Sequence, residues 1–225
     1  MSRVPGGIGI LGGTFNPIHL GHLRAAEEVR TALGLDEMRL VPAAIPPHKD
    51  AGPIVEARHR LRMVELAIAG VPGFRAWDVE LGRSGPSYSV DTLRALRAEV
   101  GDTARIVFVL GRDAFAGFGT WREYPAIFAL CDLVVMTRPP WPPELTIDDF
   151  PVAAQGSFGY DPARECYRHA SGHGVSLQRI TALDISATAI RANVAAQHSI
   201  RFLVPPAVEQ YIAAEQLYRS EHSTI

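Results

Sequence analysis

The sequence has little cysteine, no marked excess of charge of either sign and no long hydrophobic run. Its 225 residues include two cysteines, Cys131 and Cys166, too few for a disulfide framework, which suits a reducing compartment. Lys and Arg number 22 and Asp and Glu 24, a net charge of −2, so composition predicts no nucleic-acid or membrane partner. No apolar stretch approaches the roughly 20 residues of a membrane span, and the first residues do not resemble a signal peptide. We therefore expect a cytoplasmic protein.

The sequence does have a regular alternation of short apolar runs and helical repeats. The runs predict strands at 8–11, 38–41, 77–81, 105–110, 133–137 and 175–180. The repeats predict helices at 23–33, 61–68, 93–100, 187–196 and 206–215. Continuous apolar strands are typical of parallel sheets that are covered on both faces. The pattern predicts a Rossmann-like, three-layer α/β/α fold with a mostly parallel sheet, whose ligands bind at the carboxyl ends of the strands.

One segment does not fit this pattern. Residues 139–174 are rich in proline and lack a clear period. We expect a long loop or excursion there rather than a second domain, so that residues 1–225 form a single domain.

The first apolar run raises the question of a dinucleotide site, because GIGILG at 7–12 fits the pattern G-x-G-x-x-G. In a true fingerprint the glycines follow the strand, where the backbone turns beneath a pyrophosphate. Here Gly7 and Gly9 flank Ile8, so they lie before or inside the predicted strand. This placement argues against a hydride-transferring oxidoreductase.

A stronger signal is the turn at 12–17, GGTFNP, which is followed by His19 and His22 at the start of the predicted helix. Glycines permit close backbone approach, a helix N-terminus attracts anions, and imidazoles can donate hydrogen bonds to phosphate oxygens. We predict a phosphate site here. The spacing matches no zinc motif and no Cys or acidic ligand lies nearby, so no metal site is predicted. Two ordinary histidines at a helix start stay open as the alternative.

GGTFNPIHLGH at 12–22 is similar to the G-T-F-D/N-P-x-H-x-G-H signature of the nucleotidylyltransferase superfamily, and ISATAIR at 185–191 resembles its I-S-S-T-x-I-R signature. Within the superfamily the chain resembles the bacterial nicotinate-mononucleotide adenylyltransferases. Segments similar to theirs are PPHK (46–49), SYSVDT (87–92), GRD (111–113) and TWREY (120–124). The resemblance covers nearly all of residues 7–218 except 139–174.

The resemblance implies transfer of AMP from ATP to nicotinate mononucleotide, which forms nicotinate adenine dinucleotide and pyrophosphate. Attack by a phosphate oxygen needs no protein nucleophile, so catalysis would consist of positioning and charge stabilisation. Mg²⁺ would arrive with the ATP phosphates. Nicotinamide mononucleotide or phosphopantetheine as acceptor, and a nucleotide-binding regulatory module without turnover, remain alternatives. The sequence does not determine the oligomeric state, so a homo-oligomer stays open.

The resemblance also implies residue roles. The catalytic residues would be His19, His22, Lys49 and Arg191. ATP would be bound by Gly12, Gly13, Thr14, Phe15, Gly111, Asp113, Ile185, Ser186 and Thr188. Nicotinate mononucleotide would be bound by Ser89, Trp121, Arg122 and Arg58. Backbone N–H groups near Ser89 and Arg122 would bind the nicotinate carboxylate, and Trp121 would stack on the pyridine ring.

Several of these residues have simpler alternatives. Helix caps, core packing or surface charges could account for Ser186, Asp113, Trp121, Lys49 and Arg58. Two positions depart from the family pattern: Ala187 replaces a second serine, which removes one hydroxyl contact, and Arg112 stands where a small residue is commoner. The sequence offers no account of Arg112.

Overall fold

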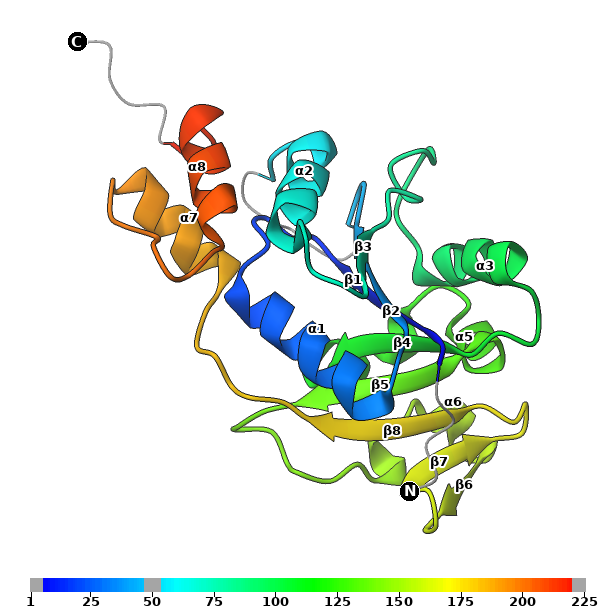
Figure 1. The fold of residues 1–225 in the computed structure, drawn as a ribbon. Coiled ribbons are helices and arrows are strands. Elements are labelled where there is room, and N and C mark those ends of the chain that lie inside the picture. Colours follow the sequence, from blue (N-terminus) through cyan, green and yellow to red (C-terminus); the bar gives the residue numbers. More distant parts are fainter. Residues whose placement is uncertain (1–5, 47–53, 220–225) are drawn as a thin grey trace.

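The computed structural model describes residues 6–46 and 54–219. Within them, eight strands form one sheet in the order β3-β2-β1-β4-β5-β8-β7-β6, with helices on both faces (Figure 1). Strands β1 to β5 and β8 pair in parallel, whereas β6 and β7 pair antiparallel. The predicted Rossmann-like architecture with a mostly parallel sheet is confirmed.

The element bounds follow the predicted alternation along most of the chain. The strands are β1 (Ile8–Gly13), β2 (Glu37–Pro42), β3 (Phe74–Ala76), β4 (Ile106–Gly111), β5 (Asp132–Thr137), β6 (Phe158–Asp161), β7 (Cys166–His169) and β8 (Gly174–Arg179). The α-helices are α1 (Leu20–Leu33), α2 (Ala57–Ile68), α3 (Ser89–Val100), α4 (Arg112–Ala116), α5 (Tyr124–Leu130), α6 (Val152–Gln155), α7 (Ala187–Ala195) and α8 (Pro206–Ala214). Two 3₁₀ turns are η1 (Phe118–Thr120) and η2 (Ile147–Asp149).

Strand β4 shows how the three layers are built. Val107 and Val109 pack into the core beneath α1, α2, α7 and α8. Ile106, Phe108 and Leu110 pack into a second core beneath α3, α4 and α5. Successive side chains of a strand point to opposite faces, so a strand that is apolar throughout must be covered on both.

The middle of the sheet contains the point at which the strand order reverses. β1 pairs in parallel with β2 on one side and with β4 on the other. The chain therefore leaves β1 toward β2 and β3 and returns to β4 on the opposite side of β1. The connections that follow β1 and β4 diverge, and the crevice between them at the carboxyl ends of the strands is where ligands bind in such sheets.

Residues 139–174 do not form one long loop, which was one of the two forms expected for this segment. This segment contains η2, α6 and the hairpin of β6 and β7, which joins the sheet through β8. Phe150 anchors it, because its ring lies 4.7 Å from that of Phe158, 5.0 Å from that of Tyr167 and 5.3 Å from that of Phe115 in α4. The two hairpin strands are four residues long and only partly buried, so they leave a weak hydrophobic pattern in the sequence.

The strand predicted at 77–81 is also wrong, since β3 ends at Ala76. The backbone N–H of Leu81 donates to the carbonyl of Asp78, and that of Arg83 donates to Glu80. These turns use backbone groups that a strand would need for pairing. The apolar alternation reflects burial of Trp77, which is 7% exposed, beside a turn.

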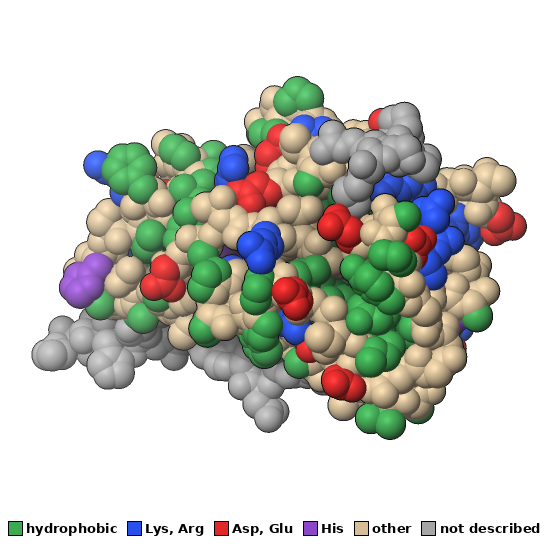
Figure 2. Space-filling model, turned by 90° about the horizontal axis from the view of Figure 1, so that it is seen from below, with side chains coloured by type: hydrophobic (Ala, Val, Ile, Leu, Met, Phe, Trp, Pro, Cys, Tyr) green, Lys and Arg blue, Asp and Glu red, His purple; other side chains and the backbone are tan. Residues whose placement is uncertain are grey.

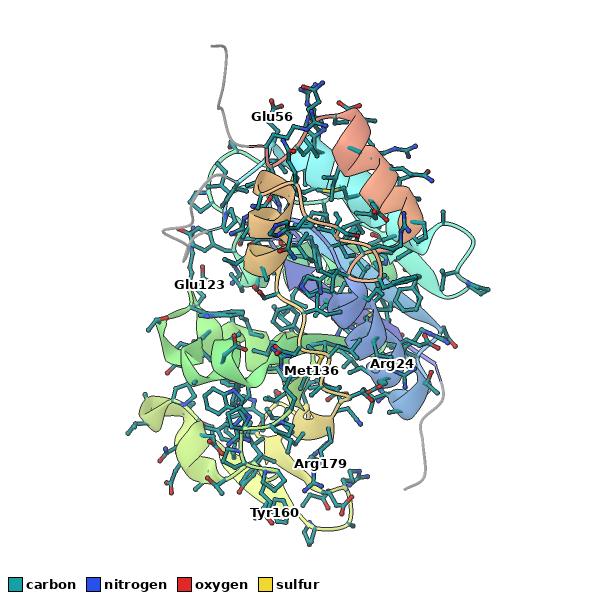
Figure 3. All side chains as sticks on the ribbon, turned by 90° about the vertical axis from the view of Figure 1, so that its left-hand side faces the viewer. Arg24, Glu56, Glu123, Met136, Tyr160 and Arg179 are labelled. Atoms are coloured by element: carbon teal, nitrogen blue, oxygen red, sulfur yellow. The ribbon has the colours of Figure 1, made fainter. Side chains whose placement is uncertain are left out.

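The outer surface carries charges of both signs. Figure 2 shows acidic and basic side chains scattered over the face seen from below, in keeping with the small net charge. Figure 3 places Glu56 and Tyr160 at opposite ends of the molecule, with Met136 of β5 between them. None of the helices in the described parts of the chain is long and apolar enough to cross a membrane.

Gly9 provides a test of the packing around β1. A Cβ atom at this position would lie 2.8 Å from Met38 Cε and 2.9 Å from Leu35 Cδ1. We expect Gly9→Ala to lower the free energy of unfolding by about 1–3 kcal/mol, because it overpacks a tight interior. Gly12→Ala is the control, since its Cβ would meet no atom within 4 Å. Its free energy of unfolding should fall no more than about 0.5 kcal/mol below that of the wild type. Urea unfolding measures both, and equal stabilities would contradict the packing argument.

Candidate active site

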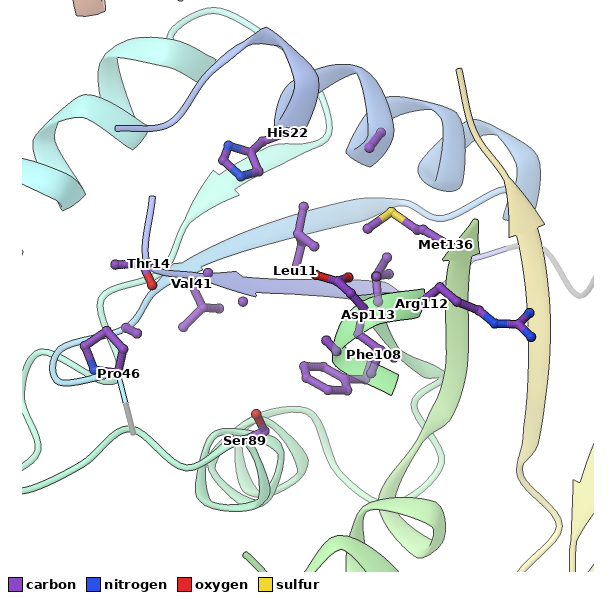
Figure 4. A pocket seen from close by; sticks show the side chains of 18 of the residues that line it. Leu11, Thr14, His22, Val41, Pro46, Ser89, Phe108, Arg112, Asp113 and Met136 are labelled. Carbon is purple, nitrogen blue, oxygen red and sulfur yellow. The ribbon is translucent and has the colours of Figure 1, made fainter. Parts of the chain in front are cut away.

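A cleft of about 900 Å³ opens at the carboxyl ends of β1 and β4 (Figure 4). Its volume lies near the upper end of the roughly 300–1,000 Å³ of small-molecule sites. The predicted site residues that line it are Gly12, Gly13, Thr14, His19, His22, Ser89, Gly111, Asp113, Trp121, Arg122, Ile185, Ser186 and Thr188. Residues that lie far apart in the sequence are thus gathered at the switch point of the sheet.

Gly12 and Gly13, which were expected in a turn, are the last two residues of β1 and line the cleft. A Cβ on Gly12 would meet no atom, whereas one on Gly13 would lie 3.0 Å from the ring of Phe15. Phe15 is buried, at 2% exposure, and its ring contacts His22 edge-on with 5.1 Å between centroids. Phe15 was predicted to bind ATP. The structure places it behind His22, where it supports the imidazole rather than lining the cleft.

His19 and His22 form a stacked pair at the start of α1. Their ring centroids are 3.6 Å apart and the planes are inclined by 23°. The backbone N–H of His19 donates to Nδ1 of His22 at 3.3 Å, so a neutral His22 carries its proton on Nε2. The His19 ring covers Gly21, where a Cβ would lie 3.0 Å from Nδ1 of His19. Glycine at position 21 therefore permits the stacked arrangement.

His19 is a buried imidazole, with 6% exposure. Its Nδ1 has no hydrogen-bond partner among the described residues. Burial, with a smaller contribution from the cation of Arg138, lowers the pKa of His19 to about 4. The ring is therefore neutral near pH 7, and a polyphosphate placed beside it would raise its pKa, because an opposite charge favours the charged form.

The second sequence motif meets the first one at the cleft. Ser186 caps α7 by accepting a hydrogen bond from the N–H of Ala189 at 3.1 Å. Arg191 donates to the carbonyl of Asn16 at 2.8 Å and to Oγ1 of Thr188 at 3.3 Å. Arg191 thereby ties the α7 motif to the turn after β1. Ala187, the departure from the family pattern, also lies on the cleft wall.

The end of β4 directs a carboxylate into the cleft. A Cβ on Gly111 would lie 2.5 Å from Oδ1 of Asp113, so the carboxylate folds back over Gly111 and depends on the missing side chain. Figure 4 shows the Asp113 side chain extending toward Leu11 in β1. Asp113 is the second residue of α4, and it lines the cleft.

The predicted acceptor side is built around the start of α3. Ser89 is the first residue of that helix. The guanidinium of Arg122 lies 4.7 Å from the ring centre of Tyr88. Trp121 packs against Phe118, with 5.1 Å between ring centroids, and also lines the cleft. The sequence left core packing and a place on the cleft wall as alternatives for Trp121. In the structure this side chain does both.

Arg58 is not part of this assembly, and Arg191, predicted to be catalytic, does not line the cleft itself. The Arg58 side chain is 72% exposed, pairs with Glu56 at 2.9 Å and does not line the cleft. Lys49 lies outside the described residues.

The cleft lining also includes residues that the sequence did not single out, among them Glu80, Arg138 and Trp141. Burial raises the pKa of Glu80, although the Thr92 hydroxyl donates to its carboxylate at 2.5 Å and opposes the shift. Arg138 directly follows β5, so the rule that ligands bind at strand ends could have identified it. Glu80 lies in a turn and leaves no recognisable pattern.

A cleft at the switch point of a parallel sheet, with a glycine turn and two imidazoles at a helix start, is suited to the phosphates of a nucleotide. The fold and the site therefore define an α/β protein of the nucleotidylyltransferase type.

Comparison with known proteins agrees with this class. Residues 10–193 match the cytidylyltransferase-like family model. The chain is similar to proteins described as "Probable nicotinate-nucleotide adenylyltransferase" from Citrifermentans bemidjiense (47% identity, 94% of this chain and 97% of the relative) and Syntrophotalea carbinolica (46% identity, 95% and 98%). The chain belongs to the cytidylyltransferase-like family and, within it, to the nicotinate-nucleotide adenylyltransferases.

A solved structure supports the fold independently. The nicotinic acid mononucleotide adenylyltransferase of Plasmodium falciparum, solved in complex with NaAD, superposes with a TM-score of 0.69 over 95% of this chain and 97% of that one. Its sequence identity is 18%, so this likeness concerns the fold alone.

The buried His19 predicts a pH-dependent stability of the unliganded protein. The unfolded chain binds a proton at this ring near pH 6.5, and the folded chain does so only at about 4. Between these values the unfolded state holds more protons, so stability falls as the pH falls, by at most about 3 kcal/mol.

Urea unfolding of wild type and His19→Asn measures this effect at about pH 7.5, above the window from about 4 to 6.5, and at about pH 4.5, near its lower end. The stability advantage of the wild type over the variant should shrink at the lower pH. An advantage that does not change with pH would contradict the buried neutral ring.

Proposed function

We propose that this chain transfers the AMP group of ATP to nicotinate mononucleotide, forming nicotinate adenine dinucleotide and releasing pyrophosphate. The observation that carries the proposal is the stacked His19–His22 pair, which lines a cleft together with Gly12 at the end of β1 and with Trp121. The relatives, which align over nearly the full length, carry the name of this activity.

The reaction needs little covalent chemistry from the protein. A phosphate oxygen of the acceptor attacks the α-phosphorus of ATP in line, the bond to the β-phosphate oxygen breaks, and pyrophosphate leaves. Negative charge shifts toward the leaving group, where His22 can donate from Nε2 and His19 can add a second donor. Ser186 and the first turn of α7 offer further donors. Catalysis then rests on position and charge.

Mg²⁺ fits this scheme as part of the ATP complex. Among the described residues no group of three or more His, Cys, Asp or Glu side chains is arranged to hold a metal ion. The triphosphate oxygens and water would therefore supply most of the ligands of a hard cation. The ion would neutralise charge on the phosphates, while Asp113 and the turn after β1 hold the nucleotide.

The histidine role predicts a specific loss of activity. His22→Ala should lower kcat by about 10²–10³, the cost of removing one donor to a developing charge, and should leave the fold intact. Pyrophosphate release with ATP and nicotinate mononucleotide measures the effect. His198→Ala removes an exposed imidazole outside the cleft, so this control should retain wild-type activity. A His22→Ala enzyme as active as the control would remove the proposed role.

The acceptor side predicts a preference for the acid over the amide. The start of α3 at Ser89 presents N–H donors, and Arg122 adds a cation nearby. Both favour a carboxylate over a carboxamide. Specific activities with nicotinate and nicotinamide mononucleotides, measured side by side, should favour nicotinate. Equal activities would contradict the assignment. ATP binding without pyrophosphate release with either acceptor would favour a regulatory module.

A further inference from the structure

Arg112 makes a partly buried ion pair on the wall of the cleft. Its side chain is 5% exposed, and one guanidinium nitrogen donates to Oδ1 of Asp149 at 2.6 Å. Another donates to the backbone carbonyl of Glu144 at 2.7 Å. Arg112 begins α4, between Gly111 and Asp113, which are both on the cleft wall. A charge buried this deeply is costly unless its partners are well placed, so these contacts hold Arg112 and residues 144–149 together.

The acceptors of Arg112 belong to residues 138–150, which we call the wall segment. Asp149 also stabilises η2, since its Oδ2 accepts a hydrogen bond from the N–H of Thr146 at 2.7 Å. A single carboxylate therefore links Arg112 to the local fold of the segment. The same end of the segment is held by the edge-on contact of Phe150 with Phe115 in α4.

The other end of the wall segment reaches the cleft. Arg138 and Trp141 line it, and the N–H of Trp141 donates to the carbonyl of Arg138 at 3.0 Å. The hydroxyl of Thr137 in β5 donates to the carbonyl of Pro142 at 3.2 Å. The segment is thus tied to β5 at its start and to α4 near its end, and Arg112 provides the polar bonds of the second attachment.

We propose that Arg112 is a positioning residue for the nucleotide that binds between Asp113 and the wall segment. Its bonds to Glu144 and Asp149 hold Trp141 and Arg138 at a set distance from the end of β4, and they hold the first turn of α4, which carries Asp113. The inference rests on the proposed function, because it assigns this end of the cleft to ATP. It also accounts for a large, charged residue at a position where the family pattern has a small one.

The inference makes a selective kinetic prediction. Arg112→Met keeps an unbranched side chain but removes all five donors. It should raise the KM for ATP by about tenfold, the size expected for displacing one hydrogen-bonded contact. The value of kcat and the KM for nicotinate mononucleotide should change by less than about twofold, because the bonds of Arg112 go to Glu144 and Asp149 of the wall segment. Arg112→Lys, which keeps the charge, should lie between Arg112→Met and the wild type.

Matched variants separate this role from general destabilisation. Asp149→Asn removes the charge of the partner. The double variant Arg112→Met/Asp149→Asn should have a KM for ATP no higher than that of Arg112→Met alone, because both changes break the same link. Arg164→Met is the control. It breaks the 2.8 Å pair with Asp161 in the exposed hairpin outside the cleft, and it should leave both KM values unchanged. Urea unfolding of each variant identifies any that are poorly folded. If Arg112→Met does not fold, the KM for ATP of Asp149→Asn tests the inference in its place.

Calorimetric titration with ATP and hydrogen exchange at the amides of Thr146 and Asp149 complete the test. Weaker ATP binding and faster amide exchange in Arg112→Met support the inference. This holds even if the protein shows no turnover with nicotinate mononucleotide, because that result would overturn only the proposed function. An unchanged KM for ATP in folded variants, or equal changes for both substrates, would overturn the inference while the proposed function stands.

Discussion

The parallel pairing of β1 with both β2 and β4 is the constraint on which the remaining structure depends. It reverses the direction in which strands are added and separates the connections that follow β1 and β4. The glycine turn and α1 emerge on one side of the resulting crevice, and Asp113 and α4 on the other. A chain with little net charge can bind a polyphosphate under these conditions, because the donors are concentrated at one place rather than spread over the surface.

Burial sets the charge of His19 on a cleft wall that also carries fixed charges. His19 stays neutral in the free protein because desolvation lowers its pKa, and two stacked imidazoles 3.6 Å apart would repel one another if both were charged. Arg191 is engaged with Asn16 and Thr188. It braces the two motifs against each other even before any ligand binds. The cleft is thus preorganised by hydrogen bonds, and its charge can respond to the nucleotide.

Local chemistry explains which elements were predictable. The helix predicted at 23–33 ends at Leu33 as expected, because Gly34 adopts a left-handed conformation (φ 62°) directly after it. Ser186 caps α7 as its residue type predicted. The β6–β7 hairpin was not predictable in this way, because its strands are four residues long and only partly buried, so they leave a weak hydrophobic pattern. Nor was Glu80, whose burial results from the packing of a turn.

The sequence by itself determined the alternating strands and helices, the glycine-rich end of the first strand and the family, because these depend on local conformational preference and on contiguous motifs. Tertiary structure alone decided that Phe15 supports His22 from behind, that Arg58 stays at the surface and that Arg112 joins α4 to the wall segment. Each of these depends on which side chains meet across the fold. Such tertiary contacts are determined by the order of the strands in the sheet and by close packing, which no local sequence pattern encodes.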